Sequence, residues 1–273
     1  MNILSVTDMH GETWRYKTLI KMAKQEKADL VINCGDMLPF GNKMDIQGKF
    51  IKYALREHFE AINKEKIYYA FIPGNEDLKM FDDDLKDIIK DLDYIKYVDN
   101  NITEIGGYEI LGLSVCPDFP FKIKDRMRRD KDNFKSPEQM DPPEISTKEN
   151  GLVKIASSQE YIDSMPTIEE ELKSLAKPKN MNKSIYVIHA PPSKIGLDAC
   201  GEMYFAGSNA VYDFICLNQP LLTLHGHIHE SPWVSGRWFG MIGNTLCIQP
   251  GRSDSFIYVK IDTVTRKYER IEM

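Results

Sequence analysis

The sequence predicts an α/β fold built on mixed sheets. Short apolar segments typical of buried strands alternate with longer segments whose apolar residues recur at helical spacing. Strands that alternate with helices in this way form parallel sheets. The pair Gly106-Gly107 lies between two short β-like runs in residues 102–115 and indicates a hairpin. We therefore expect strands of both orientations.

The N-terminal half supplies three of the expected strands, at residues 2–6, 29–33 and 67–72. The expected helices of this half are residues 14–27, 50–62 and 79–91. His58 lies in the middle of the second helix, and we expect it at the surface or half-buried. After residue 150, the pattern Thr167-x-x-Glu170 is a capping box for a helix to about residue 176. Ser208 caps another helix, which ends near residue 217. The remaining expected strands are residues 184–188, 221–224, 246–248, 255–261 and 267–271.

Residues 117–150 interrupt this alternation. They contain five prolines and a basic cluster, which consists of Lys122, Lys124, Arg126, Arg128, Arg129 and Lys131. A long polar segment inside a compact domain is typically functional or disordered. The segment is therefore either a lid whose positive charge attracts an anionic substrate or a solvated insertion. In both cases we expect a single domain over residues 1–273.

The composition excludes several classes of protein. The 273 residues are 42% hydrophobic and 28% charged, as in ordinary globular proteins. A net charge of 35 − 41 = −6 argues against a broad basic surface for nucleic acid. We expect neither a signal peptide nor a membrane-spanning segment. The five cysteines form no CxxC pair and predict reduced thiols in a cytoplasmic protein.

Residues with metal-binding side chains follow five of the expected strands. They are Asp8, His10, Asp36, Asn75, His189, His227 and His229. Four of the chain's six histidines are among these seven positions, so a separate structural reason for each is implausible. Because the carboxyl ends of parallel strands open on one edge of a sheet, we expect the seven side chains to converge. Seven nitrogen and oxygen ligands suit two divalent cations that share a carboxylate.

In order and spacing, these blocks resemble those of the calcineurin-like metallophosphoesterases. The blocks are Asp8-Met9-His10, Gly35-Asp36, Gly74-Asn75-Glu76-Asp77, His189 and Gly226-His227-Ile228-His229. The stretches His189-Ala190-Pro191-Pro192 and Gln249-Pro250-Gly251-Arg252 look like those of the Icc-like phosphoesterases of bacteria and archaea. The resemblance implies a metallophosphoesterase-like α/β fold, namely a four-layer αββα sandwich with mixed sheets.

The resemblance also implies which residues hold each ion. One metal would take Asp8, His10, Asp36 and His229, and the other would take Asp36, Asn75, His189 and His227. Asp36 and a water or hydroxide would bridge the two ions, and the hydroxide would attack phosphorus. Asn75 and His10 would be the catalytic residues beside the phosphate. The ligands suit two divalent transition metals from Mn, Fe, Zn, Co and Ni, among which the sequence does not choose. We expect His225 to support a neighbouring ligand or to pack in the core, rather than to bind a metal itself.

The sequence departs from the family pattern at position 76. Many members have a histidine there, proposed to protonate the leaving group, whereas this chain has Glu76. A carboxylate beside a phosphate dianion is repulsive unless it is protonated or turned away. Diesters carry less charge, and aryl or nucleotide leaving groups need less help. We therefore expect a phosphodiesterase that acts on a small phosphate ester such as a nucleotide derivative.

Two other functions are alternatives. The same site would serve a phosphomonoesterase, such as a nucleotide or phosphoprotein phosphatase. Some family members have lost metal ligands and act as protein-interaction scaffolds, but none of the seven residues is missing here. The net acidity argues against a DNA nuclease. The sequence defines neither the natural substrate nor the oligomeric state.

Overall fold

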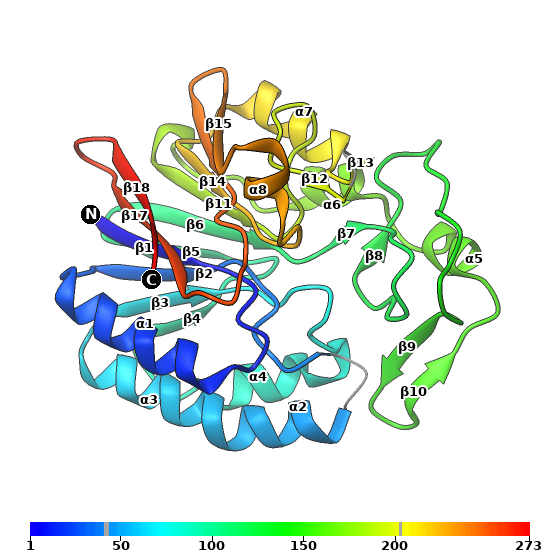
Figure 1. The fold of residues 1–273 in the computed structure, drawn as a ribbon, viewed down its shortest axis with the longest axis horizontal. Coiled ribbons are helices and arrows are strands. Elements are labelled where there is room, and N and C mark those ends of the chain that lie inside the picture. The colour runs from blue at the N-terminus through cyan, green and yellow to red at the C-terminus, as the bar shows by residue number, and fades with distance from the viewer. Residues whose placement is uncertain (41–43, 202–203) are drawn as a thin grey trace.

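Two six-stranded sheets lie face to face, and helices cover the outer face of each (Figure 1). The structure is a computed structural model that describes residues 1–40, 44–201 and 204–273. Its four layers confirm the αββα sandwich with mixed sheets that the resemblance implied.

The first sheet holds the strands of the N-terminal half and the C-terminal hairpin. Its order is β18 (Lys267–Glu272), β17 (Ile257–Asp262), β1 (Asn2–Val6), β2 (Leu30–Asn33), β3 (Tyr68–Phe71) and β4 (Ile95–Tyr97). Strands β1 to β4 are parallel to one another, and β17 and β18 are antiparallel to their neighbours. Its outer face is covered by α1 (Thr13–Gln25), α2 (Met44–Phe50), α3 (Arg56–Lys64) and α4 (Asp82–Asp87).

The second sheet is parallel at its centre and antiparallel at both edges. Its order is β15 (Phe239–Ile242), β16 (Thr245–Ile248), β14 (Leu222–Leu224), β11 (Ser184–Ile188), β6 (Tyr108–Leu113) and β5 (Ile102–Ile105). The antiparallel pair β5–β6 confirms the hairpin at Gly106-Gly107, where both glycines have positive φ. Its outer face is covered by α6 (Ile168–Ser174) and α7 (Asn209–Asn218).

Alternation along the strands divides the core into layers. In β1, Ile3 packs between the two sheets, and the next residue, Leu4, packs under the helices. Ile185 and Val187 of β11 belong to the layer between the sheets, and Tyr186 to the layer under α6 and α7. Successive side chains of a strand point to opposite faces, so these continuous apolar runs serve two cores at once.

The remaining strands and α-helices are short, and they were not expected from the sequence. They are β7 (Cys116–Pro117), β8 (Met127–Arg128), β9 (Glu144–Thr147), β10 (Gly151–Lys154), α5 (Ser158–Asp163), β12 (Ala199–Cys200), β13 (Tyr204–Phe205) and α8 (Ser231–Ser235). The helix expected over 79–91 is shorter, with a 3₁₀ turn at Lys79–Phe81 followed by α4. No helix in the described part of the chain is both long and apolar enough to cross a bilayer.

The insertion lies beside the two sheets, where Figure 1 shows its strands β8 and β9 together with β10 and α5, which follow it in the chain. Each member of its basic cluster is paired with a carboxylate: Lys122 with Glu144, Lys124 with Asp118, Arg126 with Asp82, Arg128 with Glu171, Arg129 with Asp163 and Lys131 with Asp213. Lys124 is completely buried, and Arg126 and Arg128 are nearly so. The cluster therefore does not present the free positive charge expected of an anion-attracting lid.

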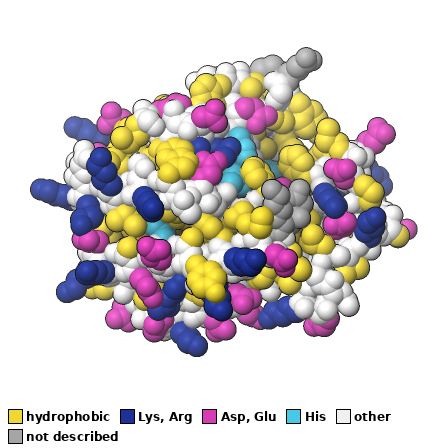
Figure 2. Space-filling model, turned by 60° about the horizontal axis from the view of Figure 1, so that its bottom comes forward, with side chains coloured by type: hydrophobic (Ala, Val, Ile, Leu, Met, Phe, Trp, Pro, Cys, Tyr) yellow, Lys and Arg dark blue, Asp and Glu magenta, His cyan; other side chains and the backbone are white. Residues whose placement is uncertain are grey.

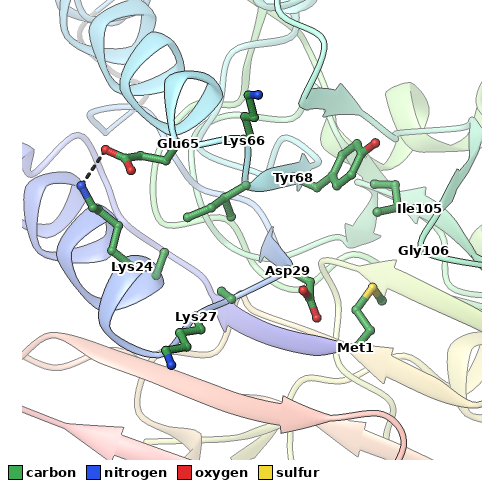
Figure 3. Close-up of a pocket in the computed structure, with 12 residues that line it drawn as sticks. Met1, Lys24, Lys27, Asp29, Glu65, Lys66, Tyr68, Ile105 and Gly106 are labelled. Carbon is green, nitrogen blue, oxygen red and sulfur yellow. Dashed lines mark hydrogen bonds and ion pairs between the residues drawn. The ribbon is translucent and has the colours of Figure 1, made fainter.

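A pocket of about 740 Å³ lies at the end of the first sheet that is remote from the candidate ligands (Figure 3). Its lining includes Asp29 and Tyr68, which stand at the beginning of β2 and β3, and the Lys24–Glu65 ion pair. The candidate ligands follow the other ends of the same strands. This pocket is therefore separate from the site described below.

His58 is buried, and the expectation of a surface or half-buried position was wrong. It follows Leu55 by three residues and precedes Ile62 by four, so the helical period places it on the apolar face of α3. Its ring packs against Tyr16 and Tyr69, with centroids 4.9 and 5.5 Å away. Burial lowers the pKa of His58 to about 3.

This shift predicts an acid-sensitive contribution to stability. The unfolded chain protonates His58 near its ordinary pKa of about 6.5, so between that pH and about 3 the unfolded state binds the extra proton. Stability therefore falls as the pH falls through this window. His58→Leu should reduce the loss of unfolding free energy between about pH 7 and about pH 5 by roughly 2 kcal/mol. Chemical unfolding of both metal-free proteins at the two pH values measures this, and equal losses would contradict it.

Candidate metal centre

All seven candidate ligands follow the carboxyl ends of strands, but they come from two sheets rather than one. Asp8, Asp36 and Asn75 follow β1, β2 and β3 of the first sheet, and His189 and His227 follow β11 and β14 of the second. Histidine side chains reach the surface in Figure 2, with hydrophobic, basic and acidic side chains beside them. The site therefore lies where the ends of the two facing sheets meet.

The backbone turns sharply at these residues. Asp8, His10, Asp36 and His227 have φ values of 52, 45, 51 and 73°. Positive φ is uncommon for residues other than glycine, and such conformations cluster at functional sites. The loops are fixed by hydrogen bonds between them, for example from the Asp8 N–H to the Gly35 carbonyl at 3.0 Å.

Close approach explains two glycines of the sequence blocks. A Cβ on Gly74 would lie 2.2 Å from Asp36 Oδ1, and one on Gly226 would lie 2.0 Å from Thr7 Oγ1. Neither position has room for a side chain, because the neighbouring atom belongs to a buried loop next to the candidate ligands. The glycines let the loops approach one another.

The first group of candidate ligands is Asp8, His10, Asp36 and His229. One ligand atom from each lies within 4.8 Å of the others. His10 Nε2 is 3.0 Å from His229 Nε2, and His229 Nε2 is 3.5 Å from Asp8 Oδ1. An ion bound about 2.0–2.1 Å from each of two nitrogens keeps them about 3 Å apart. The spacing therefore fits a shared metal.

The second group centres on the side-chain oxygen of Asn75. This Oδ1 lies 2.6 Å from His227 Nδ1 and 3.0 Å from His189 Nε2. His189 Nδ1 donates to the Cys34 carbonyl oxygen at 2.7 Å. A metal-ligating histidine typically uses its second nitrogen in this way, which fixes the ring and leaves the other nitrogen for an ion.

Asp36 connects the two groups. Its Oδ2 is 3.9 Å from His10 Nε2 in the first group and 3.6 Å from His189 Nε2 in the second. Its Oδ1 accepts a hydrogen bond of 2.8 Å from the Glu76 backbone N–H. The carboxylate is thus held by a loop on one side while its other oxygen faces both groups of ligand atoms.

Charge and burial in the centre suit cations. Burial lowers the pKa of His10 to about 4 and that of His227 to about 3, so both rings are neutral, as metal ligation requires. Although burial alone lowers the pKa of His189, the Asp36 carboxylate raises it to about 9. A metal would displace that proton. Asp8 Oδ2 is buried and has no hydrogen-bond partner within the described part of the chain.

An unpaired buried carboxylate oxygen is costly unless a cation balances it. The donors are imidazole nitrogens, two aspartates and an amide oxygen, which fit divalent transition metals. The residues present therefore fit a pair of such ions.

The side chain of Asp77 accepts hydrogen bonds from the backbone. It is buried and accepts hydrogen bonds from the N–H groups of Met37, Leu38 and Gly74 at 3.0, 2.7 and 2.9 Å. Burial, together with the neighbouring charge of Asp36, raises its pKa to about 7. Its carboxylate therefore holds the loops that carry Asp36 and Asn75 rather than orienting a side chain at position 76.

His225 braces the second sheet. Its Nδ1 lies 2.9 and 3.0 Å from the carbonyl oxygens of Ile188 and Ala190, and its Nε2 lies 2.8 Å from Thr223 Oγ1. These contacts occupy both ring nitrogens. His225 thus stands outside the two groups of candidate ligands.

The sequence did not indicate that three further residues lie next to the centre. The Phe40 ring stacks on His10 with centroids 4.2 Å apart, and Phe119 of the insertion meets the His227 ring edge-on at 4.9 Å. Cys116 forms a third group of ligand atoms with His189 and His227. The insertion therefore reaches the candidate centre through Phe119.

Comparisons with known proteins agree with the fold. A model of the calcineurin-like phosphoesterase family matches residues 1–231. No curated protein shows significant sequence similarity to the chain. Among solved structures, TT1561 of Thermus thermophilus is similar with a TM-score of 0.59 at 18% identity, over 99% of this chain and 98% of that one.

Two enzymes share the fold at lower scores. A 5'-nucleotidase precursor, also from Thermus thermophilus, has a TM-score of 0.51 at 13% identity, over 100% of this chain and 54% of that one. A dimetal phosphatase from Danio rerio has a TM-score of 0.50 at 12% identity, over 91% of this chain and 86% of that one. At these identities the likeness concerns the fold alone. Because the family model covers most of the sequence, the chain belongs to the calcineurin-like phosphoesterase family.

Proposed function

We propose that the protein hydrolyses phosphate esters with two divalent transition-metal ions. Asp8, His10, Asp36 and His229 hold one ion, and Asp36, Asn75, His189 and His227 hold the other. The observation that carries this proposal is the position of Asp36 Oδ2, which lies 3.9 Å from a ring nitrogen of the first group and 3.6 Å from one of the second. One carboxylate can therefore serve both ions.

Two such ions, when bound, lower the pKa of a water and stabilise the attacking and leaving oxygens of an in-line displacement at phosphorus. Asn75 and His10 lie beside the phosphate in this proposal. The Asn75 oxygen faces His189 and His227, so its amide nitrogen is the donor that remains for a phosphate oxygen. Phe40 stacks on His10 and fixes the plane of its ring.

We infer the substrate class from the carboxylate at position 76. Glu76 is held next to the centre, since its N–H donates to Asp36 Oδ1 and its carbonyl accepts from Gln47 Nε2 at 2.7 Å. A carboxylate in this place opposes a phosphate dianion more than a diester monoanion. We therefore propose a phosphodiesterase, with a phosphomonoesterase as the competing activity, in a single domain that includes the insertion.

Metal reconstitution tests the proposal. Metal-free protein, loaded separately with Mn, Fe, Zn, Co or Ni, should bind up to two ions per chain. It should then cleave an aryl phosphodiester faster than the matching aryl monoester, because Glu76 repels the dianion. Chelation should abolish both reactions. Elemental analysis and product release measure these outcomes, and activity that persists with one ion or none would exclude the mechanism. A faster monoester reaction would instead exclude only the diester preference.

A further inference from the structure

Cys116 is completely buried at the beginning of β7, where the chain leaves the second sheet for the insertion. Its Sγ and one ring nitrogen each of His189 and His227 lie within 4.8 Å of one another. We propose that Cys116 gives a thiolate to the ion held by His189 and His227, so that this half of the centre has a sulfur ligand. The inference rests on the proposed metal centre.

The surroundings of Cys116 fix its position. Its backbone N–H donates to the Arg126 carbonyl at 3.0 Å, and β7 pairs with β8 at this residue. The Arg126 guanidinium is itself buried and paired with Asp82. Cys116 then packs in a small apolar cluster with Met127, Ile162 and Ala190. The insertion thus holds the thiol at the edge of the centre.

The other buried cysteines are engaged elsewhere. Cys34 Sγ lies 3.6 Å from the Ser5 hydroxyl, and Cys247 Sγ lies 3.9 Å from the Thr245 carbonyl oxygen. Cys116 is a free cysteine, and Nε2 of His227 is buried without a hydrogen-bond partner within the described part of the chain. A thiol and an imidazole in this state are available to a cation.

The two halves of the centre then differ in chemistry. The first group offers only carboxylate and imidazole, whereas the second adds sulfur. Thiolate ligands favour zinc and iron, and oxygen ligands suit manganese. On binding, the Cys116 S–H bond breaks, its proton passes to solvent, and a sulfur–metal bond forms, because a coordinating thiol is deprotonated outright. We therefore expect the second position to select zinc over manganese.

X-ray absorption on the wild-type zinc protein tests this directly. A sulfur shell at about 2.3 Å, next to nitrogen and oxygen at about 2.0–2.1 Å, is the expected result. The cobalt protein should show a thiolate-to-cobalt charge-transfer band in the near ultraviolet. Both signals should disappear in Cys116→Ser, and its zinc affinity at the second position should fall roughly 10-fold or more while manganese affinity stays unchanged.

Cys247→Ser is the matched control, since Cys247 is equally buried but packs on the outer face of the second sheet. It should keep both signals. Zinc surrounded only by nitrogen and oxygen in the wild type, or a sulfur signal that survives Cys116→Ser, would overturn the inference. The wild-type spectrum decides even if Cys116→Ser does not fold. Failure to bind any metal would instead refute the proposed function.

Discussion

Asp36→Ala should leave the protein without either ion at working concentrations and reduce phosphoesterase activity by about 10²–10³-fold or more, at least as much as the loss of one catalytic charge stabiliser. The reason is its position, since its Oδ2 faces ring nitrogens of both groups of candidate ligands. His189→Ala removes a ligand from the second group alone. It should therefore retain the first ion and more activity than Asp36→Ala.

Removal of the charge at this position should also weaken the metal-free fold. Asp36 is almost completely buried, and its Oδ2 lies 3.6 Å from Nε2 of His189, whose pKa the carboxylate raises. Although burial alone raises the pKa of Asp36, the neighbouring His189 lowers it. Asp36→Asn keeps the size but leaves His189 without this partner. The metal-free Asn variant should therefore unfold at a lower temperature than the wild type at neutral pH, and added metal should stabilise the wild type far more.

Elemental analysis, kinetics and thermal unfolding with and without metal measure these effects. Asp93→Ala provides the control, because Asp93 is an exposed carboxylate just before β4 of the first sheet. If Asp36→Ala binds two ions, or if it loses no more activity than His189→Ala, then Asp36 does not serve both positions.

The candidate ligands could be predicted because each follows a short apolar strand. A strand such as β1 is recognisable from five residues, and the end of a strand places the next polar residue at the edge of the sheet. The local pattern could not show which of these strands belong to the first sheet and which to the second. Asn75 and His227 follow strands of different sheets, yet Asn75 Oδ1 lies 2.6 Å from His227 Nδ1. Only the packing of the two sheets against each other brings these ends together.

The contacts of the insertion could not be predicted from the sequence. Its cations look free in the sequence, but Arg128 pairs with Glu171 and Lys131 with Asp213, which are 43 and 82 residues away. Likewise, Phe119 reaches His227 across more than a hundred residues of chain. Such contacts have no periodicity, because they depend on where a loop folds back over the sheets. Composition therefore suggested a positive surface where the structure has paired charges.

The largest effect on substrate choice is expected at position 76. A general acid commonly contributes about 10²–10⁴-fold, and its contribution is greatest when the leaving group is basic. With Glu76 in the wild type, hydrolysis should depend steeply on leaving-group pKa, and aryl esters should react far faster than alkyl esters. Glu76→His should restore a proton donor, flatten this dependence and raise alkyl monoester hydrolysis relative to aryl diester hydrolysis.

The structure limits the size of that gain. Asp77 already accepts three backbone N–H groups, at Met37, Leu38 and Gly74, so it is not available to orient an imidazole at position 76. We therefore expect a gain for alkyl monoesters of roughly 10-fold, below the usual range for a well-placed general acid. The backbone of residue 76 should stay in place, because its N–H and carbonyl are bonded to Asp36 and Gln47.

Glu76→Gln separates the two roles of this residue, since it removes the negative charge without adding an acid. If repulsion alone limits monoesters, Gln and His should raise monoester hydrolysis equally and leave the leaving-group dependence steep. If the missing proton donor limits the reaction, only His should flatten that dependence. Rates for a series of aryl and alkyl esters, measured at fixed metal content, distinguish these cases. The opposite outcome is that the wild type cleaves alkyl monoesters as readily as aryl diesters and that both variants lose both activities. This result would identify Glu76 as the general acid and would contradict the proposed diester preference.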